Sequence, residues 1–325
     1  MARERFVQHF RPDHVDRLAA CCDLVSREPF GSIADIGACR DDVEIVVTGW
    51  GSPRIGPDSL AVLPRLRLVA HAAGTLKNIV DPALFPHGLR VTTAARVNAA
   101  PVAEFCLSWI LRWNKGIDRF ERDYRLSRSG YDFADRSAVG SGDDRISVGI
   151  ISASHVGRSL IRLLQPIDVE CLLFDPFVDE AAAGAMGARK VDLEPLLEMA
   201  DVVSLNAPLL PATERMIGAR QFAAMKDGAL FINTARGRIV DHEAMADALS
   251  EGRISAVLDV TDPEPLPSGS PLWDMPNVWI TPHVAGSLGH EVFRMTDWCL
   301  SEVERYCRGE ALLSEIRPSD WGRAA

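Results

Sequence analysis

The residues of this chain most suited to chemistry are an arginine, a glutamate and a histidine that follow three short apolar runs in its second half. Arg236 stands in the sequence Asn-Thr-Ala-Arg-Gly, Glu264 in Asp-Pro-Glu-Pro, and His283 in Thr-Pro-His. A guanidinium can bind a carboxylate through two parallel hydrogen bonds. An imidazole can carry a proton near neutral pH, and a neighbouring carboxylate can orient it and stabilise its charged form. Together these residue types suit the reduction of a small oxo acid.

Each of these three residues also has an ordinary structural explanation. An arginine in a glycine-containing turn is more often a surface or helix-capping residue. A glutamate between prolines is commonly just exposed, and a histidine after proline is commonly structural. The order in which Arg236, Glu264 and His283 occur, together with the motifs described next, favours the catalytic interpretation.

A loop further upstream predicts a nucleotide site. The Rossmann fingerprint places three glycines between a strand and a helix, with an acidic residue about twenty positions later. The matching residues 152–157 read Ser-Ala-Ser-His-Val-Gly, so only the third glycine is present. Asp175 ends the next strand-like run, where a carboxylate accepts hydrogen bonds from the ribose hydroxyls of NAD and repels the extra phosphate of NADP. We therefore expect NAD as the cofactor, with a plain α/β turn as the alternative.

Strand and helix patterns alternate along the chain, which predicts an α/β fold with parallel sheets. The expected strands are residues 43–49, 66–71, 89–93, 145–151, 169–174, 201–205, 229–232, 256–258, 278–280 and, in the tail, 311–316. The expected helices begin at Asn98, with Pro101 in the first turn, and cover 156–164 and 289–309, whereas 127–144 reads as a loop. This order predicts two Rossmann-like, doubly wound domains. A nucleotide-binding domain of residues 98–289 would be inserted into a discontinuous substrate domain of residues 1–97 plus 290–325.

Composition limits the class of partner. The net charge of −10 argues against nucleic acid as the main partner. No apolar run approaches the length needed to cross a bilayer, and the N-terminus lacks the apolar stretch of a signal peptide, so we expect a cytoplasmic protein without membrane contact. The seven cysteines show no paired metal-ligand spacing, although Cys21 and Cys22 are adjacent. They are interpreted as buried reduced thiols, and no metal site is predicted.

From about Val43 to Gly309 the chain resembles the D-isomer-specific 2-hydroxyacid dehydrogenases. Residues 98–104 are similar to the hinge helix of that family, and the arginine, glutamate and histidine motifs follow in the family's order. The resemblance implies the split two-domain fold, NAD as cofactor and a homodimer formed through the nucleotide domain. It also implies an enzyme that interconverts a small D-2-hydroxy acid and its 2-oxo acid.

The resemblance further assigns roles to matching positions. Arg236 would bind the substrate carboxylate, His283 would exchange a proton with the carbonyl oxygen, and Glu264 would hold the imidazole. The cofactor would be bound by Ser154, His155, Val156, Asp175, Asn206, Pro208, Thr213, Thr234 and Asp259. The substrate carboxylate would also meet the loop residues Ala73, Gly74 and Thr75. Here the chain departs from the family, with Thr75 at the site of a glycine and Lys77 at the site of an aspartate.

Two other functions remain compatible with these motifs. The family includes corepressor relatives that keep the fold and bind NADH as a signal, with weak or no turnover. A pseudoenzyme that lost the cofactor together with its two glycines is the second alternative. Titration with NADH separates the pseudoenzyme from the other two.

Overall fold

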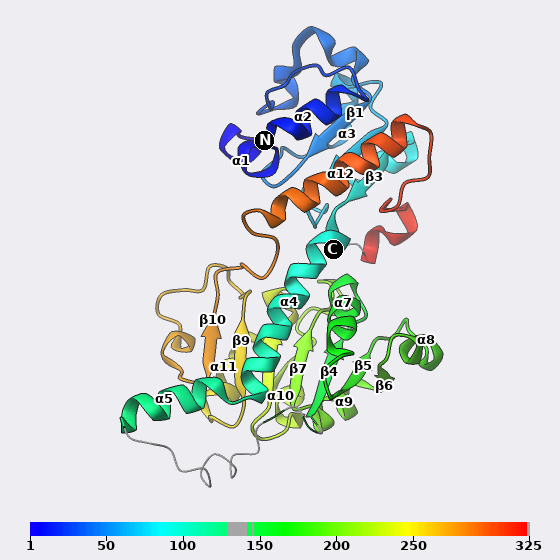
Figure 1. Ribbon diagram of the computed structural model, residues 1–325. Helices are drawn as coiled ribbons and strands as arrows, with labels where there is room; N and C mark the ends of the chain where they lie inside the picture. Colours follow the sequence, from blue (N-terminus) through cyan, green and yellow to red (C-terminus); the bar gives the residue numbers. More distant parts are fainter. Residues whose placement is uncertain (129–141, 143, 145, 324–325) are drawn as a thin grey trace. The chain divides into compact units, whose positions relative to one another are not determined.

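The chain forms two compact units in the computed structural model, which describes residues 1–128, 142, 144 and 146–323 (Figure 1). Unit 1 consists of Met1–Ala99 and Ser287–Ala325, and unit 2 of Ala100–Gly286. Unit 2 is thus inserted into the sequence of unit 1. Most of the loop expected over 127–144 lies outside the described residues. None of the helices in the described ranges is both long and apolar enough to cross a membrane.

Unit 2 is built on a parallel sheet with the strand order β10-β9-β8-β7-β4-β5-β6 (Figure 1). Its strands are β4 (Ile146–Ile151), β5 (Val169–Phe174), β6 (Arg189–Lys190), β7 (Val202–Leu205), β8 (Leu230–Asn233), β9 (Ser255–Leu258) and β10 (Val278–Ile280). The chain starts at β4 inside the sheet and builds outward first on one side and then on the other. The strand order therefore reverses between β4 and β7, and open α/β sheets bind their ligands outside the strand ends at such a point.

Helices cover both faces of this sheet, so that its strands are buried on both sides. These helices are α4 (Ala95–Asn114), α7 (His155–Leu164), α8 (Glu180–Ala185), α9 (Leu193–Met199), α10 (Ala219–Ala224) and α11 (His242–Ser250). The helix α5 (Ile117–Ser127) follows α4 and has no buried residue. Short 3₁₀ turns, η3 (Gly237–Ile239) and η4 (Pro271–Asp274), complete the unit. Successive strand residues enter opposite cores, because Ile150 packs with Leu160 of α7 and Ile151 packs with Leu196 of α9.

The start of α4 corrects one prediction. The sequence suggested a helix that begins at Asn98 with Pro101 in its first turn, but the helix begins at Ala95 and Pro101 lies inside it. The hydroxyl of Thr93 accepts the amide N–H of Ala95, the first residue of the helix, at 3.2 Å. The Asn98 side chain instead accepts the amide N–H of Ser287 at 2.9 Å.

Unit 1 contains a three-stranded parallel sheet, β1-β2-β3, with helices around it. Its elements are α1 (Arg3–His9), α2 (Pro12–Ala19), η1 (Ile33–Asp42), β1 (Ile45–Thr48), α3 (Pro57–Val62), β2 (Leu68–His71), η2 (Pro82–His87), β3 (Arg90–Thr93), α12 (Glu291–Cys307) and η5 (Pro318–Arg323). Along β2, Leu68 packs in the core that includes Leu300 of α12, whereas Val69 packs in the core that includes Leu63. The C-terminal helix is therefore part of the same unit as the N-terminal strands.

The prediction of a strand over residues 311–316 is wrong. This segment makes only an isolated antiparallel bridge, between Glu315 and Thr92, and the amide N–H of Ile316 donates to the Val91 carbonyl at 2.9 Å. The fully buried carboxylate of Glu302 accepts the amides of Leu313 and Ser314, at 3.0 and 2.9 Å. Because a side chain in α12 binds these amides, they cannot join a strand ladder.

Two buried histidines of unit 1 predict acid sensitivity. Burial lowers the pKa of both His9 and His71 from 6.5 to about 4. Between these two pH values the unfolded chain binds protons that the folded chain excludes, so the stabilisation is complete above pH 6.5 and is lost as pH falls toward 4. For His71 the loss approaches about 3 kcal/mol of unfolding free energy.

Urea unfolding measured across this pH window tests the expectation. The variant His71→Asn should flatten the dependence of the unfolding free energy on pH. His87→Asn, which changes an exposed histidine of the same unit, is the control and should keep the wild-type slope. Equal slopes in the wild type and the His71→Asn variant would contradict this account.

Candidate active site at the carboxyl edge of the larger sheet

The strand register aligns the ends of six strands in unit 2. Ile151 of β4 pairs with Phe174 and with Leu205, and Asn233 of β8 pairs with Leu205 and with Leu258. With Ile280, which pairs with Leu258, these residues form one continuous row across the sheet. The residues that directly follow this row are Asp175, Ser152, Asn206, Thr234, Asp259 and Thr281. The loops that carry most of the predicted site residues therefore leave the sheet at the same edge.

The loop between β4 and α7 is a tight turn that requires its single glycine. A Cβ atom added to Gly157 would lie 2.1 Å from the carbonyl oxygen of Ser152, so that any side chain would push the helix away from the strand end. Ser154 is the N-cap of α7, and its hydroxyl oxygen accepts the amide N–H of Gly157 at 3.3 Å. The next residues, His155 and Val156, form the first turn of α7, and the N-terminus of a helix can bind a phosphate.

The side chains of Ser152 and Asp175 are hydrogen-bonded to each other at this loop. Ser152 stands at the position of the first fingerprint glycine with φ at 80°, in the left-handed region that costs a residue with a Cβ about 1–2 kcal/mol. Its hydroxyl lies 3.2 Å from Oδ2 of Asp175, and the amide N–H of Ala153 donates to the same oxygen at 2.8 Å. The other carboxylate oxygen accepts the amide of Phe177 at 2.8 Å. The buried carboxylate of Asp175 thus holds the loop in place.

We predict that Ser152→Gly binds NADH at least as tightly as the wild type and raises the unfolding free energy by about 1 kcal/mol, because glycine adopts a positive φ at no steric cost. Ser152→Ala is the matched control, since it removes the hydroxyl but keeps the Cβ. Fluorescence titration with NADH and urea unfolding measure the two effects. A marked loss of NADH affinity in both variants would instead make the hydroxyl a needed phosphate donor.

The predicted cofactor residues after β7 and β8 use their side chains for internal bonds. The amide of Asn206 donates to the carbonyl oxygen two residues earlier, at 3.0 Å. The hydroxyl of Thr213 donates to the carbonyl oxygen of Pro208 at 2.6 Å and so closes the loop between them. The hydroxyl of Thr234 lies 3.4 Å from the thiol of Cys106. These contacts fix the shape of the carboxyl edge around the strand reversal.

Asp259 holds the turn that carries His283. Its Oδ1 accepts the hydroxyl of Thr281 at 2.6 Å and the amide of Val284 at 2.8 Å, and its Oδ2 accepts the amide of Ala285 at 2.9 Å. The carbonyl oxygen of Asp259 also accepts the amide N–H of His283 at 2.9 Å. His283 has φ at 56°, a conformation that persists in non-glycine residues only where the surroundings enforce it. Asp259, which is fully buried, provides that enforcement.

His283 and Glu264 form a direct pair. Nδ1 of the imidazole lies 2.6 Å from Oε1 of Glu264. The two side chains are 49% and 43% exposed, so the pair stands at the surface of unit 2 and a small molecule can reach it. Because Nδ1 is used by the carboxylate, Nε2 is the ring atom that remains to exchange a proton with a ligand.

Arg236 is a half-buried cation beside this pair. Burial lowers the pKa of its guanidinium, and the charge of Glu264 partly opposes that effect. One of its terminal nitrogens donates to the carbonyl oxygen of Ala235 at 2.6 Å. Among the described residues no carboxylate forms an ion pair with Arg236. A guanidinium that is partly desolvated and lacks a paired anion is a ready binding group for an anionic ligand.

Two residues that the sequence reasoning missed hold the arginine motif against the glutamate loop. A Cβ atom on Gly237 would lie 2.1 Å from the carbonyl oxygen of Thr261, so glycine is required for this close approach. Nε2 of His242 accepts the amide N–H of Asp262 at 3.1 Å, and its ring also hydrogen-bonds the backbone of Gly237. Gly237 is visible in the sequence motif, but nothing near His242 in the sequence indicates a partner twenty residues away.

The predicted substrate loop, residues 73–75, lies in unit 1 and follows β2. The hydroxyl of Thr93 lies 2.9 Å from the carbonyl oxygen of Ala73 and 2.5 Å from that of Gly74. The buried His71 at the end of β2 bonds the hydroxyl of Thr48 through Nδ1, at 2.9 Å, and also the backbone of Thr75. The carbonyls of the loop are thereby turned toward the core of unit 1.

Comparison with known proteins assigns the chain to a family. The family model described as "D-isomer specific 2-hydroxyacid dehydrogenase, NAD binding domain" matches residues 107–285. The chain belongs to the D-isomer specific 2-hydroxyacid dehydrogenases. It is 31% identical to the glyoxylate reductase of Korarchaeum cryptofilum over 258 residues, which cover 76% of this chain and 75% of the relative.

Two further similarities support this dehydrogenase assignment. The chain is 33% identical to the (S)-sulfolactate dehydrogenase of Chromohalobacter salexigens over 258 residues, with 79% of this chain and 82% of the relative covered. A phosphoglycerate oxidoreductase structure from Rhizobium etli superposes with a TM-score of 0.78 at 25% identity and covers 96% of this chain and 95% of that one. The chain spans about half the length of the D-3-phosphoglycerate dehydrogenase of Archaeoglobus fulgidus, at 51%.

These findings confirm the family, the α/β fold with parallel sheets, the enzyme class and the cofactor that the sequence predicted. The protein is an NAD-dependent dehydrogenase of the D-2-hydroxy acid type, and its substrates are small hydroxy and oxo acids. The individual roles of Arg236, Glu264 and His283 stay predictions, and so do those of the cofactor and substrate-loop residues.

Proposed function

We propose that this dehydrogenase interconverts a small D-2-hydroxy acid and its 2-oxo acid, with Arg236 binding the carboxylate and the Glu264–His283 pair acting as acid and base. The observation that carries the proposal is the guanidinium of Arg236, which is partly desolvated, has no ion-pair partner among the described residues and lies within electrostatic reach of Glu264. The imidazole paired to Glu264 stands at the same edge of the sheet.

The proposed mechanism follows from this arrangement. Arg236 grips the carboxylate of the oxo acid through two parallel hydrogen bonds and orients the adjacent carbonyl. Bound NADH supplies the hydride for the carbonyl carbon. The protonated His283 gives the proton on Nε2 to the carbonyl oxygen, and the negative charge of Glu264 stabilises the imidazolium before this transfer. In the oxidation of the hydroxy acid, the neutral imidazole takes that proton back.

The residues at the carboxyl edge fit the dinucleotide. The strand order reverses between β4 and β7, and the first turn of α7 with Ser154, His155 and Val156 presents amides suited to the pyrophosphate. Asp175 follows β5 at the same row, and we propose that it accepts hydrogen bonds from the ribose hydroxyls. Asn206, Pro208, Thr213, Thr234 and Asp259 are proposed as the remaining cofactor contacts. Ala73, Gly74 and Thr75 are proposed to contribute backbone amides to the substrate carboxylate.

We predict that the enzyme prefers NADH to NADPH. The carboxylate of Asp175 accepts hydrogen bonds from the ribose but repels a phosphate at the same position. The residues that follow it, Pro176 and Phe177, offer no cation to that phosphate. Steady-state kcat/KM for the two cofactors measures the preference, and Asp175→Ser should reduce the ratio. A clear preference of the wild type for NADPH would contradict the role assigned to Asp175.

Consumption of NADH with a panel of 2-oxo acids tests the function as a whole. The panel should contain glyoxylate, pyruvate and hydroxypyruvate, together with phosphorylated and sulfonated analogues. The proposal requires turnover of at least one member that depends on Arg236 and His283. Tight binding of NADH with no turnover on any member would favour the NADH-sensing alternative, and absence of NADH binding would favour a pseudoenzyme.

We also propose that the enzyme is a cytoplasmic homodimer that associates through unit 2, as the family resemblance implies. The seven cysteines are free thiols, in keeping with a reducing compartment. Light scattering coupled to size-exclusion chromatography gives the oligomeric state directly. A monomer at micromolar concentration would argue against the dimer.

A further inference from the structure

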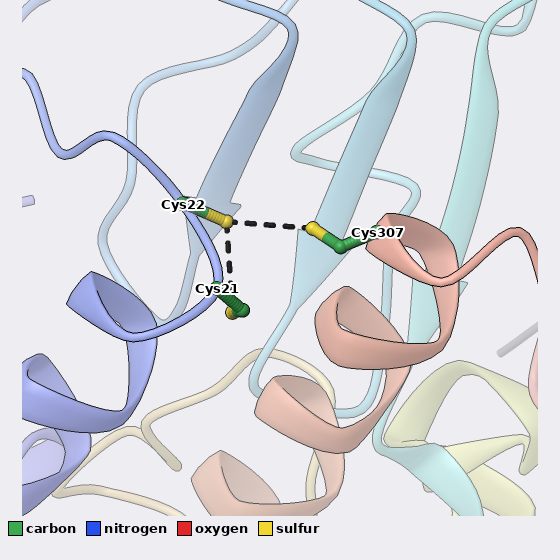
Figure 2. Close-up of side chains that lie close together, drawn as sticks. All are labelled: Cys21, Cys22 and Cys307. Atoms are coloured by element: carbon green, nitrogen blue, oxygen red, sulfur yellow. Dashed lines mark hydrogen bonds between the residues drawn. The ribbon is translucent and has the colours of Figure 1, made fainter.

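Three cysteines from distant parts of the sequence gather in unit 1, as Figure 2 shows. Cys21 and Cys22 follow the C-terminal end of α2, and Cys307 is the last residue of α12. The Sγ atom of Cys22 lies 3.7 Å from that of Cys21 and 3.6 Å from that of Cys307. All three sulfur atoms lie within 4.8 Å of one another.

The cluster corrects the expectation that the cysteines are scattered buried thiols. Cys307 is exposed, and Cys21 and Cys22 are half-buried. The sequence offered no paired metal-ligand spacing because the third sulfur comes from a residue 285 positions beyond Cys22. Only the packing of α2 against α12 brings the three together.

The distances between the sulfur atoms suit metal ligands better than a disulfide. A disulfide requires an S–S bond of about 2.0 Å. In a tetrahedral zinc site with Zn–S bonds of about 2.3 Å, neighbouring sulfur atoms lie about 3.8 Å apart. The spacings of 3.6 and 3.7 Å already approach this edge length. A small adjustment of Cys21 or Cys307 would complete a three-sulfur face around one ion.

Burial raises the pKa of the Cys21 and Cys22 thiols, so the cluster holds neutral thiols until a metal ion binds, and two arginines lie close to it. Arg17 and Arg308 both interact electrostatically with Cys21. Three thiolates around a divalent ion leave one net negative charge, which these guanidinium groups help to balance. Arg17 of α2 also pairs with Glu304 and Asp297 of α12, so the two helices that precede the sulfur atoms in sequence are held together.

We propose that Cys21, Cys22 and Cys307 bind one Zn²⁺ ion through three thiolates, with water as the fourth ligand on the exposed side. Binding releases to solvent the proton of each thiol that becomes a thiolate and changes no oxidation state. The site joins the turn after α2 to the C-terminal end of α12. Its function is structural, and it is independent of the dehydrogenase reaction proposed for unit 2.

Cobalt substitution of the reduced, metal-free, full-length protein tests the site. Titration with Co²⁺ should produce thiolate-to-cobalt charge-transfer absorption together with the visible bands of a tetrahedral ion, and these should saturate at one equivalent per chain. Added Zn²⁺ should abolish both signals, because thiolate ligands select zinc over cobalt. Elemental analysis after dialysis should then find one zinc per chain.

Single-cysteine variants identify the ligands. Cys22→Ser and Cys307→Ser should each weaken Zn²⁺ binding more than about 100-fold, since the loss of even an outer partner of a ligand costs about 10–100-fold. Cys39→Ser, which changes an exposed cysteine of the same unit outside the cluster, is the matched control and should bind zinc like the wild type. Zinc should raise the Tm of the wild type and of the control but not that of Cys307→Ser.

Two results would overturn the proposal. One is the absence of charge-transfer absorption in the reduced wild type, or its persistence in Cys307→Ser. The other is reduced protein that, given Zn²⁺ under air, forms a Cys22–Cys307 disulfide and retains no metal. Mass spectrometry under non-reducing conditions detects that bond and would assign the cluster to thiol oxidation instead.

Discussion

Replacement of His283 by alanine is expected to reduce the turnover number for 2-oxo acid reduction by about 10²–10⁴-fold, the usual contribution of general acid catalysis. The imidazole is held by Glu264 through Nδ1, which leaves Nε2 as the proton donor. NADH binding should stay intact, because the ring is not part of the loop between β4 and α7. Stopped-flow measurement of hydride transfer and fluorescence titration with NADH separate the two effects.

A structural role for His283 would give a different result. His283 has a positive φ, so alanine there changes backbone strain as well as chemistry. The pH profile of kcat distinguishes the two, because loss of the acid removes the limb that reports its ionisation, whereas a folding defect lowers activity at every pH. His87→Ala, at an exposed histidine of unit 1, is the control and should keep the wild-type profile. Unchanged turnover in His283→Ala at saturating substrate would remove the residue from the mechanism.

Much of unit 2 could be predicted because six of its seven strands are short apolar runs closed by a polar or small residue, whereas the charged two-residue strand β6 was not predicted. A strand that is buried on both faces reads as a continuous apolar segment, and parallel strands place their carboxyl ends at one edge. The aligned row from Phe174 to Ile280 is the physical reason why motifs far apart in sequence could be assigned to a single site. The pairing of Glu264 with His283 follows from the same alignment.

The predictions that failed depended on partners far away in the sequence. Glu302 of α12 binds the amides that would have made residues 311–316 a strand. The hydroxyl of Thr93, outside the expected helix, accepts the amide N–H of the first residue of α4. The cysteine cluster and the bond from His242 to the glutamate loop arise from the same kind of tertiary contact. Local sequence patterns therefore predict most strands and motifs, but they do not predict these contacts between residues far apart in the sequence.

Substitution of Arg236 tests whether its side chain binds the substrate carboxylate. Arg236→Lys keeps the positive charge but replaces a planar fork with a point charge that cannot form two parallel hydrogen bonds. Loss of one charge-assisted hydrogen bond is worth about 1.5–3 kcal/mol, which corresponds to about a 10- to 100-fold fall in kcat/KM. Since the carboxylate must also be oriented for hydride transfer, both KM and kcat should change.

The neighbouring Arg238 offers a matched control for this substitution. Arg238 is exposed, two residues further along the same motif, and it pairs with Glu214. Arg238→Lys should leave kcat/KM within about twofold of the wild type, as expected for an exposed ion pair. Steady-state kinetics with the best 2-oxo acid of the panel, at saturating NADH, measures both variants. If Arg236→Lys matched Arg238→Lys in both KM and kcat, the carboxylate would have to bind elsewhere, because a desolvated guanidinium that gripped it could not be replaced without loss.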